Sequence, residues 1–95
     1  MTEKDIESYL RDVVRKIGGK AYKFVSPGNP GVPDRIVILP DGRILFVELK
    51  APGKVSTPLQ LLKQTELIRM GCTVYPDIRS KTEVISMLAK EGFVV

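Results

Sequence analysis

Asp34, Glu48 and Lys50 are the residues of this chain whose types and spacing suggest chemistry. An apolar run over residues 36–39 follows the aspartate, and another over residues 44–47 precedes the glutamate. Charged side chains beside core-forming strands cost free energy unless they are paired or bind an ion. Carboxylate oxygens are the ligands that a hard divalent cation prefers. The pattern therefore indicates a metal that activates water against a phosphodiester, with the lysine close by.

Absent residue types narrow this chemistry. The chain has no histidine, which excludes Ser-His-Asp and Cys-His catalysis and histidine metal sites. Cys72 is the single cysteine, so neither an intrachain disulfide nor a cysteine-cluster metal site can form. Its apolar neighbours favour a buried small hydrophobe over a nucleophile. Carboxylates, lysines, hydroxyls and amides remain, and this set suits Mg²⁺ or Mn²⁺.

Length and charge bound the class of protein. Ninety-five residues predict a single domain over residues 1–95 with a small core, which oligomerisation would help to stabilise. The net charge of +4 mildly favours a polyanionic partner such as DNA. No apolar run is long enough to span a membrane and the N-terminus shows no signal peptide, so we expect a cytoplasmic protein without a membrane partner.

Hydrophobic periodicity, glycines and capping patterns predict seven elements in the order αβββαβα. This order predicts an α/β fold with a mixed central sheet flanked by helices, in which a right-handed crossover follows the hairpin. The tail over residues 93–95 is either a last short strand or a packed end. Capping boxes are expected at Thr2, where the pattern is partial, at Thr57 and at Ser80. The expected elements are a helix that follows Thr2 and has its apolar positions over residues 6–17, a strand over 20–26, a hairpin over 35–47, a helix over 58–70, a strand over 72–75 and a helix over 81–90.

The hairpin turn predicts how the two carboxylates lie relative to each other. Residues 39–43 read Leu-Pro-Asp-Gly-Arg, which fits a type I turn with proline second and glycine fourth. This turn places Leu39 opposite Arg43, and counting back along both strands places Asp34 opposite Glu48 on one face of the sheet. A two-residue loop would instead put the carboxylates on opposite faces. The turn therefore supports a shared site.

Two polar helix residues could add to this site. Glu7 lies at the edge of the apolar stripe of the first helix, so it could reach the metal or a metal-bound water, or be an exposed helical glutamate. Gln60 is the third residue of the second helix, where it is expected to close a capping box onto Thr57. It could also contact the attacking water or a phosphate.

Loop residues supply candidates for DNA contact. Lys54, Ser56 and Thr57 follow the Lys50 strand end and could hold phosphates, or simply form a polar loop before a helix. The proline- and glycine-rich loop around Asn29 is rigid and exposed. It could lie on a DNA backbone or complete a dimer edge, and an ordinary loop is the alternative.

A wider set of residues in this order resembles the VRR-NUC family, a branch of the PD-(D/E)xK nuclease superfamily. The resemblance spans nearly the whole chain, and the short length is similar to stand-alone phage and bacterial members. The residues that carry it are Gly28, Gly31, Pro33, Asp34, Val47, Glu48, Leu49, Lys50, Pro52, Gly53, Ser56 and Gln60.

The resemblance implies a restriction-endonuclease-like core and metal-dependent phosphodiester hydrolysis. It implies Asp34, Glu48 and the Leu49 backbone carbonyl as ligands of Mg²⁺ or Mn²⁺. It also implies Lys50 as the catalytic lysine, with Glu7 and Gln60 as supporting groups at the site. Stand-alone members resemble homodimeric Holliday-junction resolvases, which implies branched DNA as the substrate in a bacterial or phage-infected cell.

Other functions stay open at this point. A restriction- or packaging-type nuclease would recognise duplex DNA or flaps, and its cuts would recur at one duplex sequence. A non-catalytic DNA-binding module is a second alternative. The two facing carboxylates argue against it, because a protein that only binds DNA does not need acidic side chains beside phosphate. A small protein-interaction domain of a phage particle is the third.

Overall fold

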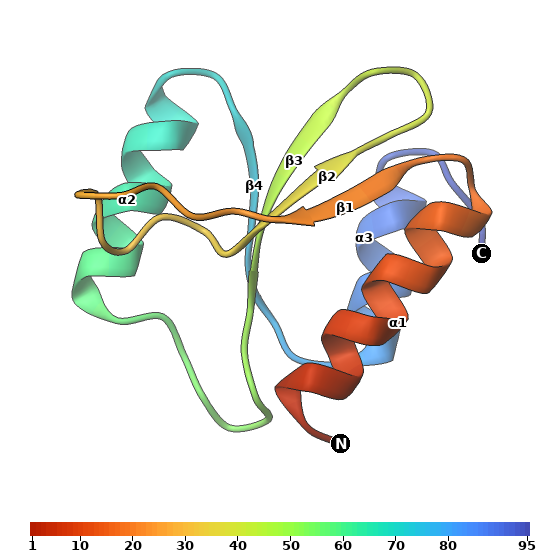
Figure 1. The fold of residues 1–95 in the computed structure, drawn as a ribbon, viewed down its shortest axis with the longest axis horizontal. Coiled ribbons are helices and arrows are strands. Elements are labelled where there is room, and N and C mark those ends of the chain that lie inside the picture. Colours follow the sequence, from red (N-terminus) through yellow and green to blue (C-terminus); the bar gives the residue numbers. More distant parts are fainter.

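The computed structural model describes residues 1–95, and its helices and strands follow one another in the predicted order (Figure 1). None of the helices is both long and apolar enough to cross a membrane. The elements are α1 (Glu3–Lys16), β1 (Lys20–Lys23), β2 (Arg35–Ile38), β3 (Ile44–Leu49), α2 (Pro58–Arg69), β4 (Thr73–Ile78) and α3 (Lys81–Lys90).

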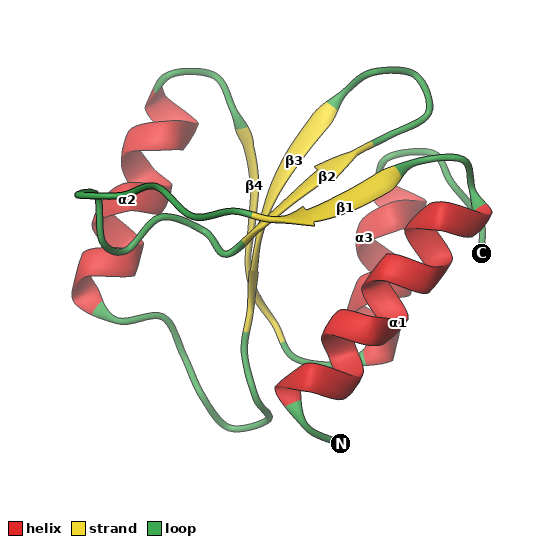
Figure 2. Cartoon of the chain, viewed as in Figure 1, coloured by secondary structure: helices red, strands yellow, loops and turns green.

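The four strands form one mixed sheet in the order β1-β2-β3-β4, as predicted. β1 and β2 pair antiparallel, as do β2 and β3, whereas β3 and β4 are parallel because α2 connects them. Helices α1 and α3 lie on one face of the sheet and α2 lies on the other (Figures 1 and 2).

The hydrophobic core lies entirely between the sheet and the α1/α3 layer, because α2 contributes no residue to it. This arrangement leaves the α2 face of the sheet outside the main core. The core residues are Ile6, Leu10, Val13, Val14, Val37, Leu39, Leu45, Val47, Leu49, Ile78, Val84, Met87 and Leu88.

Helix caps fix where the helices begin. The predicted capping boxes at Thr2 and Thr57 are complete, with the hydroxyl and the third-residue side chain each satisfying a backbone N–H. The box expected at Ser80 is only half formed. Its hydroxyl accepts from the backbone N of Glu83 at 3.1 Å, whereas the Glu83 carboxylate accepts from the backbone N of Arg79 at 2.8 Å.

The structure corrects two predicted strand boundaries and decides the form of the C-terminal tail. β1 ends at Lys23, short of residue 26, because the chain turns away into the loop that contains Asn29. β4 runs on to Ile78, since an edge strand tolerates the proline at position 76. Residues 93–95 form no strand, and only Phe93 of this tail packs against the core, whereas Val94 and Val95 are exposed.

The hairpin register matches the prediction. The backbone N of Leu39 donates to the carbonyl of Arg43 at 2.8 Å, and the N of Gly42 donates to the carbonyl of Leu39 at 2.9 Å. Gly42 has φ +89°, the left-handed conformation that glycine adopts most easily. The ladder runs to the pair of Arg35 with Val47, so one step further along it Asp34 stands across from Glu48.

The pairing of β3 with β4 contains a β-bulge that the sequence did not predict. Val47 pairs with Tyr75, but Leu49 pairs with Ile78, so β4 contains one extra residue there. Within that stretch Asp77 has φ +55°, the single positive φ of a residue other than glycine. Bulges occur often beside active sites, where they redirect a side chain. This one lies level with Glu48.

Candidate active site

Asp34 and Glu48 meet at the end of the β2/β3 hairpin. Val47 and Leu49 point into the α1/α3 core, so Glu48 between them points to the α2 face. The Glu48 side chain is 4% exposed and that of Asp34 is 27% exposed. The backbone N of Leu49 donates to Asp34 Oδ1 at 3.0 Å, which holds the aspartate against β3. The shared face predicted from the turn is therefore observed.

Glu48 has the most perturbed environment in the site. Its Oε1 is buried without any hydrogen-bond partner, and its Oε2 lies 3.8 Å from Lys50 Nζ. Burial, followed by the negative charge of Asp34, raises the pKa of Glu48 to about 7. Burial also raises the pKa of Asp34, partly offset by the hydrogen bond from Leu49.

This arrangement fits a hard cation. A buried carboxylate oxygen without a partner beside a second carboxylate is compensated when a metal binds. No group of three or more Asp, Glu, His or Cys side chains is arranged to hold a metal ion. The sequence-predicted ligands, Asp34, Glu48 and the backbone carbonyl of Leu49, include only two side chains, so water would have to complete the coordination of Mg²⁺ or Mn²⁺.

Lys50 and Gln60 contact each other in the site. Lys50 Nζ donates to Gln60 Oε1 at 2.7 Å. The same oxygen accepts from the backbone N of Thr57 at 2.9 Å and so closes the capping box. One amide oxygen therefore caps α2 and also receives the lysine, while contact of Gln60 with an attacking water or a phosphate stays a prediction.

Two arginine side chains contact the Glu7 carboxylate. Its carboxylate forms an ion pair with Arg35, and Arg11 lies 3.9 Å from its other oxygen. Arg35 Nη1 donates to the backbone carbonyl of Asp34 at 2.8 Å and lies 3.8 Å from Asp34 Oδ2. The Glu7 carboxylate therefore contacts Arg35, and Arg35 in turn contacts Asp34.

Of the residues expected to contact DNA, Ser56 and Thr57 are bonded within the protein, whereas Lys54 and Asn29 are exposed. Ser56 is buried, and its hydroxyl donates to Asp77 Oδ1 at 2.7 Å while accepting from Gln64 Nε2 at 2.9 Å. The Lys54 side chain is exposed. The Thr57 hydroxyl accepts from the backbone N of Gln60 at 3.2 Å, so it belongs to the cap.

Asn29 lies on the exposed loop between β1 and β2, where its amide donates to Ser26 Oγ at 3.0 Å. A Cβ at Gly31 would lie 2.8 Å from Leu59 Cγ, so this end of the loop packs closely on α2. The loop is thereby placed on the α2 side of the sheet, which is also the side of Glu48.

Sequence reasoning missed three polar residues around the site. Arg35 carried a signal, since strand alternation puts it on the same face as the core residue Val37. Gln64 carried one too, because it lies one turn after Gln60 on the same side of α2. Asp77 carried none, because the bulge that places it depends on pairing with β3.

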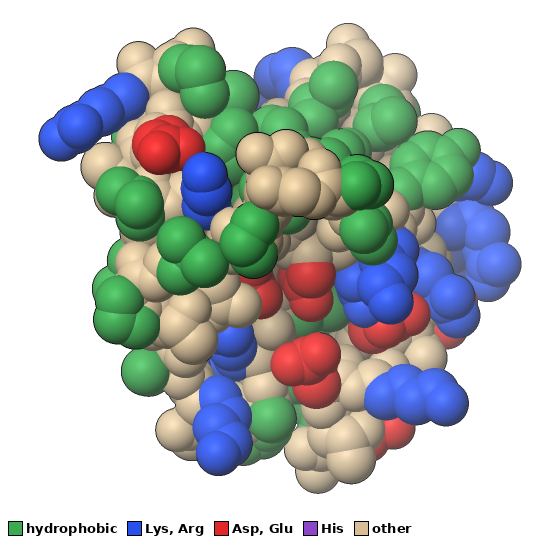
Figure 3. Space-filling view, turned by 60° about the vertical axis from the view of Figure 1, so that its left-hand side comes forward, with side chains coloured by type: hydrophobic (Ala, Val, Ile, Leu, Met, Phe, Trp, Pro, Cys, Tyr) green, Lys and Arg blue, Asp and Glu red, His purple; other side chains and the backbone are tan.

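The α2 side of the molecule shows this polarity at its surface. In Figure 3 acidic side chains gather in a hollow, with Lys and Arg side chains beside it and apolar side chains around it.

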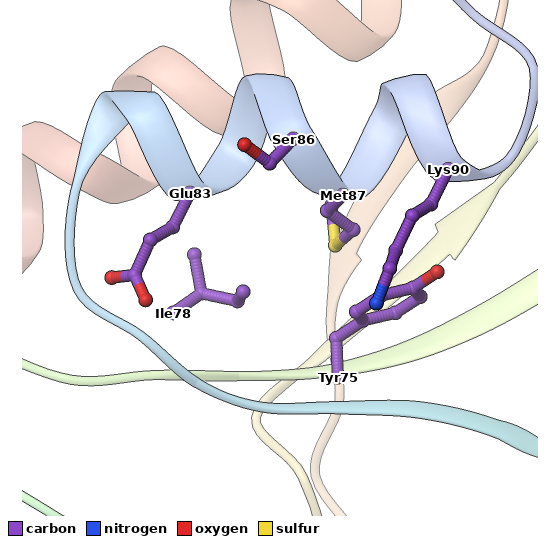
Figure 4. Close-up of a pocket in the computed structure, with 6 residues that line it drawn as sticks. All are labelled: Tyr75, Ile78, Glu83, Ser86, Met87 and Lys90. Carbon is purple, nitrogen blue, oxygen red and sulfur yellow. The ribbon is translucent and has the colours of Figure 1, made fainter.

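A separate cavity of about 190 Å³ lies between β4 and α3 (Figure 4). Its lining includes Tyr75, Met87 and Lys90 but no predicted site residue.

Comparison with known proteins assigns the chain to a protein family. No family model matches the chain. A relative from Acyrthosiphon pisum secondary endosymbiont phage 1, named "Putative nuclease p44", is 59% identical over 69 residues, which cover 73% of this chain and 74% of the relative. A solved structure described as "VRR_NUC domain" superposes with a TM-score of 0.84 at 28% identity, over 98% of this chain and 100% of that one. This chain belongs to the VRR-NUC family.

A second solved VRR-NUC structure shows the same fold. It is described as "VRR_NUC domain protein", and it superposes with a TM-score of 0.74 at 18% identity, over 94% of this chain and 86% of that one. The predicted family and the α/β fold of order αβββαβα are thus confirmed. In the VRR-NUC frame, the Asp34, Glu48 and Lys50 cluster is the candidate active site.

Proposed function

We propose that this VRR-NUC protein is a Mg²⁺- or Mn²⁺-dependent nuclease that hydrolyses phosphodiester bonds in DNA. The observation that supports it most is the buried, unpartnered Oε1 of Glu48 beside Asp34, with Lys50 3.8 Å from the other oxygen. A carboxylate left in this condition is costly in a protein that binds no cation. The name of the phage relative, a nuclease, agrees with this reading.

The bound metal would supply Lewis acidity and a more acidic water. Asp34 and Glu48 would hold it, together with the Leu49 carbonyl. The Lys50 ammonium would orient the attacking water and offset the negative charge that builds on the phosphate. Gln60 keeps that ammonium in place through its 2.7 Å hydrogen bond. Glu7 would act on the site through Arg35, which contacts both Glu7 and Asp34.

We further propose branched DNA, such as a Holliday junction, as the substrate of a homodimer. Two copies would hold two active sites at a fixed separation and so make symmetric nicks. Support for a dimer comes from α2, where Leu59, Leu61, Leu62 and Ile68 are 42–55% exposed. The exposed Lys54 and the Asn29 loop would contact phosphates. Ser56 and Thr57, whose hydroxyls are bonded within the protein, would fix the segment that carries Lys54.

A cleavage assay tests the function. Labelled four-way junction, flap, duplex and single strand are incubated with Mg²⁺, with Mn²⁺ and with chelator. We expect cleavage with either metal, strongest on the junction, and none from Glu48→Gln. Asp12→Asn is the matched control, because this exposed carboxylate lies on α1 and pairs only with Arg15.

The outcomes separate the readings. Inactivity on all four substrates with metal present would refute the nuclease proposal. Preference for plain duplex would refute the junction, and recurrent cuts at one duplex sequence would favour a restriction-type enzyme. Binding of DNA without cleavage would favour a non-catalytic module. Light scattering of the free protein tests the dimer.

A further inference from the structure

A chain of polar contacts links helix α2 to the sheet. The one buried residue of α2 is Gln64, while apolar neighbours such as Leu61 and Leu62 are about half exposed. Gln64 donates to the Ser56 hydroxyl, which donates in turn to Asp77 on β4. No apolar side chain of α2 is fully buried, although Leu67 is partly buried. This chain of hydrogen bonds is therefore a fixed polar contact between α2 and β4.

The loop from Lys50 to α2 depends on the same strand. Residues 51–55 are irregular and mostly exposed, with one internal backbone hydrogen bond, from Lys54 N to the Ala51 carbonyl. The Lys54 carbonyl accepts from Arg79 Nε at 2.7 Å, and Ser56 is held by Asp77. Both contacts therefore come from the end of β4, because Asp77 lies in the bulge and Arg79 directly follows the strand.

The bulge in β4 places Asp77 where it can accept the hydrogen bond from Ser56. Asp77 has φ +55°, a conformation that side-chain-bearing residues avoid, although Asp and Asn enter it more readily than most. An unfavourable conformation persists where surrounding contacts impose it, and such places cluster at functional sites. Here the contact it makes possible is the hydrogen bond from Ser56.

We propose that Asp77 is a positioning residue of the active site. By accepting the Ser56 hydroxyl, it fixes the loop after Lys50 and the first turn of α2. This holds Gln60 Oε1 where it receives Lys50 Nζ. The effect on cleavage rests on the proposed function, whereas the effect on the loop does not.

Two substitutions separate the side chain from the backbone. Asp77→Gly removes the carboxylate but keeps the positive φ without strain, and Asp77→Asn keeps both the conformation and an acceptor oxygen. If loop position matters, Asp77→Gly lowers kcat about tenfold or more with little change in KM, because small misplacements of catalytic groups are costly. Asp77→Asn restores most of the rate, and Asp12→Asn is again the control for one lost charge.

A double-mutant cycle tests whether Asp77 acts through Ser56. Ser56→Ala removes the donor of the same hydrogen bond, so it lowers kcat as Asp77→Gly does. Ser56→Ala also removes the acceptor of Gln64, so it is the more damaging single change. The double variant is then no worse than Ser56→Ala alone, because the contact that Asp77→Gly breaks is already lost. Additive losses in kcat would show that Asp77 does not act through Ser56 and would overturn the proposal.

Hydrogen exchange decides the case without any cleavage. Asp77→Gly is expected to speed exchange in residues 51–60 while leaving α1 unchanged, and Asp77→Asn is expected to match the wild type. Unchanged exchange in residues 51–60 of the glycine variant would refute the positioning role. A wild type without cleavage activity would instead refute the nuclease proposal. If the wild type is active and Asp77→Gly cleaves at the same rate, only the positioning role of Asp77 is refuted.

Discussion

Arg35 on β2 forms a buried ion pair with Glu7 on α1, which links two elements on opposite sides of the core layer. The Arg35 side chain is 7% exposed and that of Glu7 is 31% exposed. Arg35 also donates to the Asp34 carbonyl, so the pair ties α1 to the residue that begins the candidate site. Direct contact of Glu7 with a metal or its water stays a prediction, since this carboxylate contacts Arg35 and Arg11 here.

Arg35→Met should destabilise the fold. It leaves Glu7 without its buried partner, and losing one partner of a buried pair costs about 3–5 kcal/mol, less here because Glu7 is partly exposed. Urea unfolding measures the change. Arg11→Met is the matched control, because this exposed arginine lies 3.9 Å from Glu7 and should matter by less than about 1 kcal/mol. If both variants lost equal stability, the Arg35 pair would have no special role.

Glu48→Gln should stabilise the metal-free protein at alkaline pH. The pKa of Glu48 rises from 4.5 to about 7 on folding, so the folded state binds the proton more tightly than the unfolded state. Stability from this group is therefore greatest below pH 4.5, falls as the pH rises to about 7, and stays low above it. The shift corresponds to at most about 3 kcal/mol.

Thermal unfolding in chelator at pH 5 and pH 8 measures this difference. Wild type is expected to gain stability from pH 8 to pH 5 relative to Glu48→Gln, whose neutral amide cannot titrate. Asp41→Asn is the control, because hydrogen bonds from Arg43 lower the pKa of this exposed carboxyl. Parallel pH curves for wild type and Glu48→Gln would contradict the raised pKa.

Metal binding should depend on pH through the same carboxyl. A cation must displace the Glu48 proton, so apparent Mn²⁺ affinity should fall about tenfold per pH unit below 7 and level off above it. Calorimetry of Mn²⁺ binding to the wild type tests this without DNA. Asp34→Asn and Glu48→Gln should each bind far more weakly, and retention of wild-type affinity by either would exclude that residue as a ligand.

Lys50→Met should remove cleavage while leaving metal binding intact. The lysine contacts Gln60 and Glu48 and is not a ligand, so its loss acts on the chemical step by about a hundredfold or more. Single-turnover cleavage and Mn²⁺ calorimetry measure the two effects separately. Lys63→Met is the control, since Lys63 pairs with Glu66 on α2. Equal rates for the two variants would leave Lys50 without a catalytic role.

The sequence by itself determined the parts of this protein that short-range chemistry controls. Threonine caps set where α1 and α2 begin, and the turn around Gly42 set the hairpin register. That register brought Asp34 across from Glu48, because the thirteen intervening residues have little freedom once the turn type is fixed. The absence of histidine restricted the predicted metal to a hard divalent cation.

The tertiary structure alone decided which partner each remaining polar group takes. Ser56 was read as a phosphate contact, but packing of α2 against β4 buries it against Asp77 and Gln64. The bulge that turns Asp77 toward it arises from pairing of β4 with β3, and the Glu7 partner lies 28 residues away along the chain. Such contacts depend on how distant elements pack, because a polar group inside the fold must find its partner there and not in water.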